Sequence, residues 1–175
     1  SDIKNYHSEE HSLSNGQVLM RNYSFDEALV IVREMTDNLV LDLFEKGLVT
    51  SSLTLWIAYD HRYEHEASKG TVKLERESNS SKKIIDAVED LYLRIADRYT
   101  GIRRIEVCAN RVAPESYVQY SLFDDPKQTD KERHLQEAVL NVKQRYGKNA
   151  IMRGSNLLEC STYRERNEQI GGHRA

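Results

Sequence analysis

Hydrophobic residues recur every three or four positions in three stretches of the chain, and this spacing predicts helices over 24–47, 80–101 and 130–147. The first helix has the clearest start, because Ser24 and Glu27 form a capping box, in which each side chain accepts a hydrogen bond from the backbone N–H of the other residue. A glycine marks the end of each helix. We expect the third helix to pack through an apolar stripe of Leu135, Val139 (or Ala138), Val142 and Tyr146.

Alternating polar and apolar residues predict strands in four further stretches. A short strand over 17–21 follows an Asn-Gly turn signal. Strands over 51–61 and 71–77 are predicted to form a hairpin, and the last strand runs over 102–113. The residues expected to face the core from these last three strands are Leu53, Leu55, Ile57, Tyr59, Val72, Leu74, Ile105, Val107 and Ala109.

In chain order these elements read β-α-β-β-α-β, so the predicted fold class is α+β, with a four-stranded sheet and a helical C-terminal extension. Two amphipathic helices can cover only one face of such a sheet. The other face is then left bare, and a bare sheet face is a natural binding surface. We expect a linker over 1–11, the domain over 12–113, a loop over 114–130, and a helix with a tail over 131–175.

Composition limits the classes of protein to consider. The chain has 175 residues, 39% hydrophobic and 30% charged, which suits one soluble globular domain with an appendage. Its apolar runs are only a few residues long, which argues against a membrane span. Cys108 and Cys160 form no CxxC pair, so we expect an intracellular chain without a disulfide framework or a structural zinc site. The chain begins at Ser1 without methionine, and we expect it to be part of a longer protein.

The net charge of −3 is unevenly distributed along the chain. Residues 1–126 hold 15 Lys and Arg against 22 Asp and Glu, whereas residues 127–175 hold 10 against 6. An acidic body weighs against simple nucleic-acid binding unless its acids lie away from the binding surface. The two domain helices hold ten of these acids, so we expect most of the net negative charge of the body to lie on the helices rather than on the sheet.

No candidate active site stands out. Metal-dependent phosphoryl transfer needs clustered carboxylates at strand ends, whereas the acids here lie mostly on predicted helix surfaces. His7 with His11, and His61 with His65, have H-x3-H spacing, but neither pair has an obvious third ligand. The chain also lacks the glycine-rich motifs that bind phosphates. The sequence therefore predicts no catalytic residue and no metal site.

The bare sheet face is the first candidate binding surface. Cations and hydroxyl groups on such a face can hold the phosphates of a nucleic acid. An ordinary solvated sheet face with one half-exposed tryptophan explains the same pattern equally well. The residues predicted to point outward are Gln17, Arg21, Thr54, Trp56, Lys73 and Arg104, with Arg103 beside them at the start of the last strand.

The second candidate is SYVQYSLFDDP over 116–126, where Leu122 and Phe123 stand in a stretch without helical or strand period. An extended peptide can place Leu and Phe in adjacent apolar pockets of a partner, while the amide of Gln119 bonds the pocket rim. Alternatively, the loop folds back over the edge of its own domain. The following acids and proline are expected to keep the segment extended and off the sheet.

Taken together, the parts resemble a known family. A domain that opens with SLSNGQVLMRNYS, then ESYVQYSLFDD, then a tail ending in RERNEQIGGHRA resembles the C-terminal part of Y-family translesion DNA polymerases, in particular UmuC-like members from Gram-positive bacteria. Residues 12–113 resemble the little finger of these enzymes. The stretch Gln119, Tyr120, Ser121, Leu122 and Phe123 resembles their sliding-clamp motif, with Tyr120 in place of a small aliphatic residue.

This resemblance implies a DNA-binding domain that lays its open sheet face in the major groove of primer–template duplex DNA and tethers an error-prone polymerase to the sliding clamp. Catalysis and its magnesium ions would belong to a palm that this chain does not contain, so the chain alone should be inactive. The expected location is the bacterial cytoplasm, at the nucleoid and away from membranes. The tail over 127–175 could contact DNA or a recombinase partner, or pack on the domain.

One alternative to this function remains open at this point. A ferredoxin-like module could bind a protein partner across the bare face and no nucleic acid. A negative or strongly apolar sheet face would favour that alternative.

Overall fold

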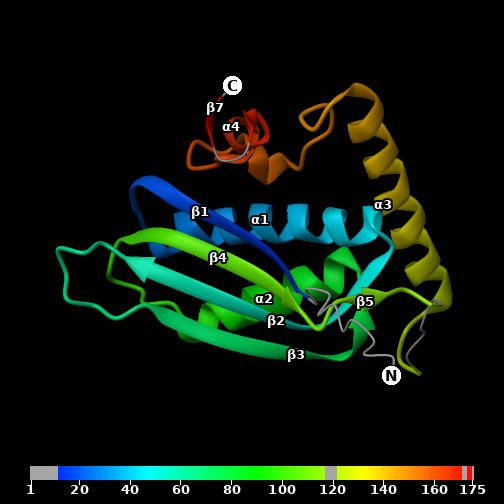
Figure 1. The fold of residues 1–175 in the computed structure, drawn as a ribbon, viewed down its shortest axis with the longest axis horizontal. Coiled ribbons are helices and arrows are strands. Elements are labelled where there is room, and N and C mark those ends of the chain that lie inside the picture. Colours follow the sequence, from blue (N-terminus) through cyan, green and yellow to red (C-terminus); the bar gives the residue numbers. More distant parts are fainter. Residues whose placement is uncertain (1–11, 117–121, 171–172, 175) are drawn as a thin grey trace, which may run out of the picture.

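The main sheet is built from two interlocking β-α-β units, as Figure 1 shows. The computed structural model describes residues 12–116, 122–170 and 173–174. In chain order the elements are β1 (Ser12–Tyr23), α1 (Phe25–Glu45), β2 (Leu48–Tyr59), β3 (Ser68–Ser78), α2 (Ser81–Ile95), β4 (Ile102–Asn110), β5 (Ala113–Pro114), α3 (Pro126–Tyr146), the 3-10 helix η1 (Gly154–Leu157), α4 (Tyr163–Asn167), β6 (Gln169–Ile170) and β7 (His173–Arg174).

The strands of the main sheet lie in the order β1-β4-β2-β3, and each neighbouring pair is antiparallel. β4 therefore separates the parallel strands β1 and β2, while β2 separates the parallel strands β3 and β4. This is the split β-α-β arrangement that the sequence predicts, and the α+β class is confirmed. The two-residue strand β5 adds a short pairing at the start of β2.

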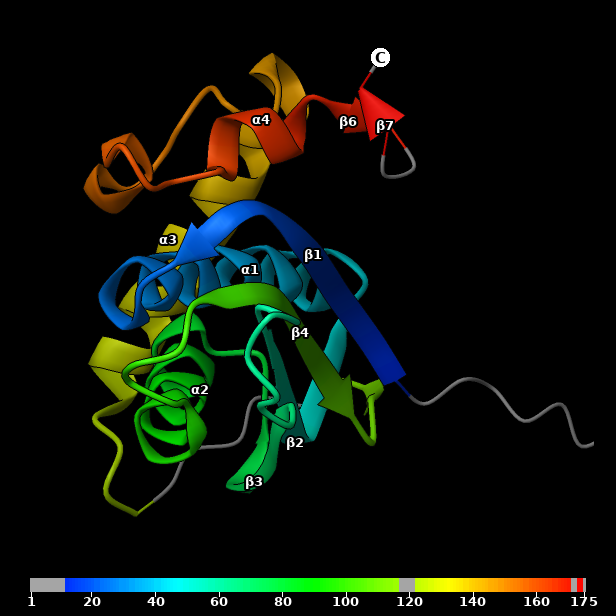
Figure 2. The same cartoon turned by 90° about the vertical axis from the view of Figure 1, so that its left-hand side faces the viewer.

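Helices α1 and α2 pack on one face of the sheet and leave the opposite face open (Figure 2). The predicted capping box of α1 is present, because Ser24 and Glu27 bond each other's backbone N–H. The buried hydroxyl of Tyr92 in α2 donates to the carbonyl of Phe25, at 2.7 Å, and so joins the two helices. Predicted core residues that are fully buried include Leu53, Leu55, Ile57, Ile105, Val107 and Ala109.

The predicted turn near the N-terminus is wrong. β1 runs without a break through Asn15 and Gly16, because these residues pair with Val107 and Glu106 of β4. Pairing with a central strand thus outweighs the local Asn-Gly turn signal. As a result, the strand is 12 residues long and contributes a full edge to the sheet.

Two further predicted ends are wrong. α2 ends at Ile95, well before the predicted glycine, because the Asp97 carboxylate accepts the backbone N–H groups of Tyr99 and Thr100 and closes a turn. β4 ends at Asn110, since the next residue, Arg111, has a φ of 50°, which is incompatible with a strand.

The prediction for α3 is wrong in its start and in its packing face. The helix begins at Pro126, because Asp125 accepts the N–H of Lys127 and acts as its N-cap. Two residues of the predicted apolar stripe, Leu135 and Tyr146, are 64% and 71% exposed. The buried residue of α3 is the polar Gln136, because this helix docks on the polar N-terminal end of α2 rather than on an apolar surface.

The segment after α3 folds back over α1, above β1 in Figure 1. It is fixed by Glu34 of α1, a buried carboxylate that accepts hydrogen bonds from Asn156 Nδ2, Ser161 Oγ and the N–H of Thr162. Burial raises the pKa of Glu34, while these donors and the charge of Arg166 act in the opposite direction. Of the alternatives for this segment, packing on the domain is what the structure shows over residues 148–169.

Candidate nucleic-acid interface and partner-binding segment

The open face of the sheet is formed by alternate residues of four strands, held in register. Arg104 lies between Val18 and Ala58, and Glu106 lies between Gly16 and Trp56. On the outer edge, β3 adds further residues opposite β2. The open face, as the term is used below, consists of Ser12, Ser14, Gly16, Val18, Ser52, Thr54, Trp56, Ala58, Lys69, Thr71, Lys73, Arg104, Glu106, Cys108 and Asn110.

A shallow hollow lies at the centre of the open face around Trp56. The guanidinium carbon of Arg104 lies 5.2 Å from the centroid of the Trp56 ring, close enough for a cation–π contact. Arg104 also lies 3.7 Å from the Glu106 carboxylate, which partly offsets its charge. Lys69 pairs with Trp56 from the neighbouring strand, so two cations flank one aromatic ring.

Beside the hollow, polar groups form a chain across three strands. The hydroxyl groups of Thr54 and Thr71 are 2.8 Å apart, and Asn110 Nδ2 donates to Thr54 Oγ1 at 2.9 Å. Burial and the nearby Glu106 carboxylate raise the pKa of the Cys108 thiol, which keeps it protonated at neutral pH. The hollow thus offers hydrogen bonds and positive charge, but no nucleophile.

The sequence-predicted residues Thr54, Trp56, Lys73 and Arg104 all lie on the open face. Arg103 adjoins them at a bulge in β4, where Tyr59 pairs with Ile102 but Ala58 pairs with Arg104. Two consecutive arginines therefore stand between the inward-facing Ile102 and Ile105.

The structure corrects the outward placement of Gln17 and Arg21. Leu19 is 1% exposed and Val18 is 64% exposed, so the odd-numbered residues of β1 face the helices and the even-numbered ones face out. The expected short strand had this alternation reversed. A shift of one residue moves every side chain to the other face.

Both corrected residues have structural partners on the helix side. Gln17 bonds the hydroxyl of Thr162 at 2.9 Å and accepts from Arg166 at 3.2 Å, which ties β1 to the C-terminal segment. Arg21 forms two hydrogen bonds with Glu27, at 2.8 and 3.0 Å, and lowers the pKa of that carboxyl to about 2. Neither side chain belongs to the open face.

The candidate partner-binding segment, residues 116–126, is described in part. Leu122 is 95% exposed and Phe123 is 91% exposed, which contradicts the alternative that this pair folds back into the domain. Gln119 and Tyr120 lie outside the described residues. The acids that follow are not merely solvated, since Asp124 forms an ion pair with Lys83 at 2.7 Å and Asp125 caps α3.

Comparison with known proteins identifies the family. Residues 10–122 match the impB/mucB/samB family C-terminal domain. The chain belongs to this family. The predicted kinship with Y-family translesion polymerases is thereby confirmed.

Two curated relatives of this family member are polymerases. The chain is 25% identical to "DNA polymerase IV 2" of Bacillus subtilis over 164 residues, 93% of this chain and 39% of that protein. It is 21% identical to "DNA polymerase IV 2" of Halalkalibacterium halodurans over 168 residues, 95% of this chain and 40% of that protein. The chain therefore spans about two fifths of the length of the curated relatives it matches.

Solved structures give a weaker likeness. One is described as "Complex of beta-clamp processivity factor and little finger domain of PolIV", with a TM-score of 0.45, 12% identity, and coverage of 65% of this chain and 100% of that chain. Another, "Post-insertion binary complex of Dbh DNA polymerase", has a TM-score of 0.42 and 15% identity, and covers 59% of this chain and 29% of that chain.

In this family member, charge is divided between the two sides of the domain. Helix α1 carries six acidic residues and one basic residue, Arg33, and it lies behind the sheet. The open face carries the cations of Lys69, Lys73 and Arg104 against the carboxylate of Glu106, and Glu75, exposed at the next alternate position of β3, adds a second carboxylate at its edge. α2 holds equal numbers of acids and bases, so the predicted acidic character of the helices comes from α1.

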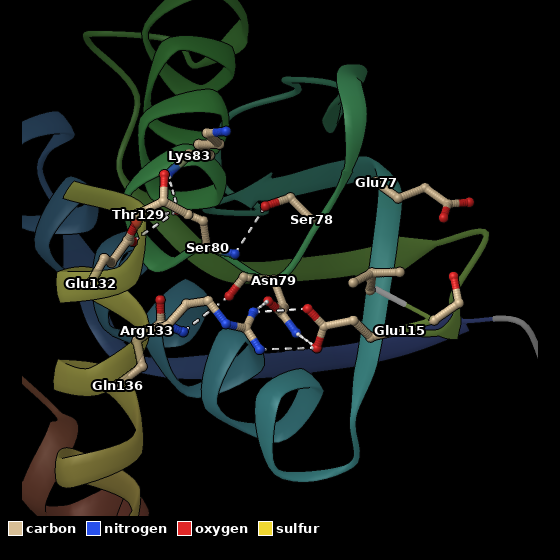
Figure 3. A pocket seen from close by; sticks show the side chains of 12 residues that line it. Glu77, Ser78, Asn79, Ser80, Lys83, Glu115, Thr129, Glu132, Arg133 and Gln136 are labelled. Carbon is tan, nitrogen blue, oxygen red and sulfur yellow. Dashed lines mark hydrogen bonds and ion pairs between the residues drawn. The ribbon is translucent and has the colours of Figure 1, made fainter. Parts of the chain in front are cut away.

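A small pocket lies where α3 meets the junction of β3 and α2 (Figure 3). Its polar groups bond one another. Arg133 lies 2.8 Å from the Glu115 carboxylate, and Asn79 Nδ2 donates to the same carboxylate at 3.1 Å. Ser80 and Lys82 bond Glu132 from the other side. The pocket is therefore a polar joint between elements.

Two classes of site have no counterpart in the described part of the chain. Within it, no group of three or more His, Cys, Asp or Glu side chains could hold a metal ion. His65 instead lies 3.3 Å from Asp97 and joins two loops, while His61 is exposed and His7 and His11 fall outside the described residues. Over the same residues, no helix combines the length and apolar character needed to cross a membrane.

Proposed function

We propose that this domain is the DNA-holding little finger of a lesion-bypass DNA polymerase, and that its open face contacts the phosphates of duplex DNA. The observation that carries the proposal is the division of charge. Cations and hydroxyls gather on a sheet face that no described element covers, while the acids of α1 lie behind the sheet. Because the acids of α1 lie away from the open face, the negative net charge of residues 1–126 does not argue against DNA binding at that face.

The spacing of the cations suits a duplex. Arg104 on β4 and Lys69 on β3 are two strand spacings apart and two residues apart along the strands, so their Cα atoms are about 12 Å apart. The major groove of B-form DNA is ~12 Å wide, so cations at this separation can reach phosphates on both of its sides. Thr54 and Thr71 add hydroxyl groups at the next level of the sheet, and Lys73 adds a further cation beyond them. These groups fix position without reading bases, as bypass of varied lesions requires.

The open face is neither negative nor strongly apolar, which disfavours a protein-interaction module that uses the same face. Its exposed large apolar residues are Val18, which lies beside Arg104, and Met20, the next outward residue of β1. The polymerase activity itself is proposed for the whole protein, by analogy with the curated relatives. Its magnesium ions would be held outside this chain, and the chain alone should not add nucleotides.

The salt dependence of duplex binding tests the DNA interface. Three phosphate contacts predict a slope of log affinity against log salt of about −3. Replacement of Lys73 and Arg104 by Ala should flatten the slope by about two, whereas Lys127→Ala with Lys131→Ala, on the exposed side of α3, should not. An equal slope for both double variants would remove the open face from the interface.

We also propose that the segment ending in Leu122 and Phe123 binds the sliding clamp. Two large apolar side chains in solvent cost free energy that burial in a partner would recover, about 25 cal/mol for each Å². Leu122→Ala with Phe123→Ala should abolish binding to the purified clamp. Leu157→Ala with Leu158→Ala is the matched control, because it removes another exposed apolar pair. Equal affinities of the two variants would refute this part of the proposal.

A further inference from the structure

Helix α3 is attached to the domain by polar side chains near both ends. Near its N-terminus, Glu132 accepts the N–H of Lys82 at 2.9 Å, and Gln136 accepts the N–H of Ser81 at 3.1 Å. These are free donors in the first turn of α2, which has no acidic residue of its own there. Gln136 also donates to the carbonyl of Asn79 at 3.0 Å. α3 thus supplies acceptors for the N–H groups of Ser81 and Lys82, whereas the N-cap of α2 itself, Ser80, accepts that of Lys83.

The far end of α3 has a second attachment. Gln144 Nε2 donates to the Glu45 carboxylate at the end of α1, at 2.9 Å. Between the two ends, the guanidinium of Arg133 lies 5.5 Å from the centroid of the Phe44 ring. Figure 1 shows the consequence, with α3 standing across the ends of the helix layer. Because α3 is attached to α2 and to α1 at points more than two turns apart, it cannot rotate freely relative to the domain as a flexible tether would.

These attachments also hold both ends of the loop that contains Leu122 and Phe123. At its start, the N–H of Glu115 donates to the carbonyl of Gly47 at 2.8 Å, and the Glu115 carboxylate pairs with Arg133 at 2.8 Å. At its end, Asp124 pairs with Lys83 of α2 at 2.7 Å, directly before the capped start of α3.

We infer that α3 is a strut that fixes Leu122 and Phe123 beside the N-terminus of α2, with Glu132 and Gln136 as its positioning residues. The inference rests on the proposed clamp binding and specifies how that contact is presented. Phe123 is one residue from its anchor at Asp124, a Cα separation of about 3.8 Å. Without the strut, Phe123 would lie eight residues beyond Glu115. The ends of a flexible chain of that length are on average about 15 Å apart, so its position would vary on that scale. The fixed anchor lowers the ordering cost of binding.

The test compares the full chain with two double variants. Glu132→Ala with Gln136→Ala removes both caps, while Glu137→Ala with Gln128→Ala removes the same functional groups from exposed positions of α3. Spin labels at Lys131→Cys and Lys69→Cys, with Cys108 and Cys160 replaced by Ser, report the distance between α3 and the sheet. Affinity for the purified clamp is measured on the same proteins without labels.

The strut predicts a narrow distance distribution in the wild type and the control, and a broad one in the cap variant. Clamp affinity should fall about three- to tenfold in the cap variant alone. Glu132→Gln, which keeps an acceptor oxygen, should restore it when paired with wild-type Gln136. A broad distribution in the wild type, or a broad one in the cap variant with unchanged affinity, overturns the strut alone. Absence of clamp binding by the wild type overturns the proposed function, and the strut with it.

Discussion

The guanidinium of Arg104 lies over the ring of Trp56, 5.2 Å from its centroid, at the centre of the open face. Trp56 is the single tryptophan of the chain, so its fluorescence reports on this one place. Duplex DNA should change the emission of Trp56 in proportion to occupancy, because a phosphate draws Arg104 away from the ring. In Arg104→Ala this change should be lost or greatly reduced. An identical signal in the variant would show that DNA binds elsewhere.

Cys108 offers a second report from the same face. The thiol lies between Ser14 and Thr54 in the hollow, whereas Cys160 lies in the C-terminal segment on the helix side. Bound duplex should slow the reaction of Cys108 with a thiol reagent and leave Cys160 unchanged. Mass spectrometry of the two labelled peptides measures this difference. Equal slowing at both cysteines would point to a general effect, and faster labelling at Cys108 would contradict the account.

The ion pair of Arg21 with Glu27 predicts a pH-dependent contribution to stability. Its bonds lower the pKa of Glu27 from 4.5 to about 2, so the folded state favours the ionised carboxyl. This stabilisation is complete above pH 4.5 and is lost as the pH falls towards 2. Because both groups are partly exposed, Arg21→Met should lower the free energy of unfolding by only about 0.5–1 kcal/mol at pH 7.

Urea unfolding at pH 7 and at pH 2.5 measures that contribution. Arg94→Met, which removes an exposed arginine from α2, is the control for loss of positive charge. The difference between the Arg21 variant and the wild type should shrink at the lower pH, while any effect of the control follows the net charge alone. A difference of constant size would mean that the pair does not stabilise the fold.

Glu34 predicts how firmly the C-terminal segment is held. Glu34→Ala would leave the buried donors of Asn156 and Thr162 without their acceptor, and each unsatisfied donor costs about 1–3 kcal/mol. Limited proteolysis should then cut the chain after Arg153 or Arg164 much faster than in the wild type. Asp26→Ala, at an exposed position of the same helix, is the matched control. Equal cutting rates in the two variants would show that Glu34 is not the anchor.

Sequence periodicity predicts the core of this fold well. The capping box of α1 and the inward residues of β2 and β4 are confirmed, because local pattern and tertiary packing agree there. The face of β1 was predicted wrongly, since Val18, Leu19 and Met20 are three consecutive apolar residues and give no alternation to choose between. The register is fixed by pairing with β4, for example of Gly16 with Glu106, and these contacts are not local.

The packing of α3 could not be predicted from its stripe for a related reason. Apolar spacing shows which side of a helix is hydrophobic, but not that a neighbouring helix leaves N–H groups of its first turn without an acceptor of its own. Gln136 is buried because the first turn of α2 has free donors, and this relation spans 55 residues of sequence. In α2, the missing acidic residue in the first turn was the available signal. The anchoring of Asp124 by Lys83 is likewise visible only in three dimensions.

The most direct test of the DNA interface is a map of the residues that respond to duplex. Nitrogen-15 spectra of the chain, recorded as a short duplex is added, report each backbone amide and the indole N–H of Trp56. The account predicts that the largest shifts gather on the open-face residues of β2, β3 and β4, with α1 and α3 unaffected. Shifts concentrated on α1, on α3 or on the C-terminal segment, with the Trp56 indole unchanged, would contradict it.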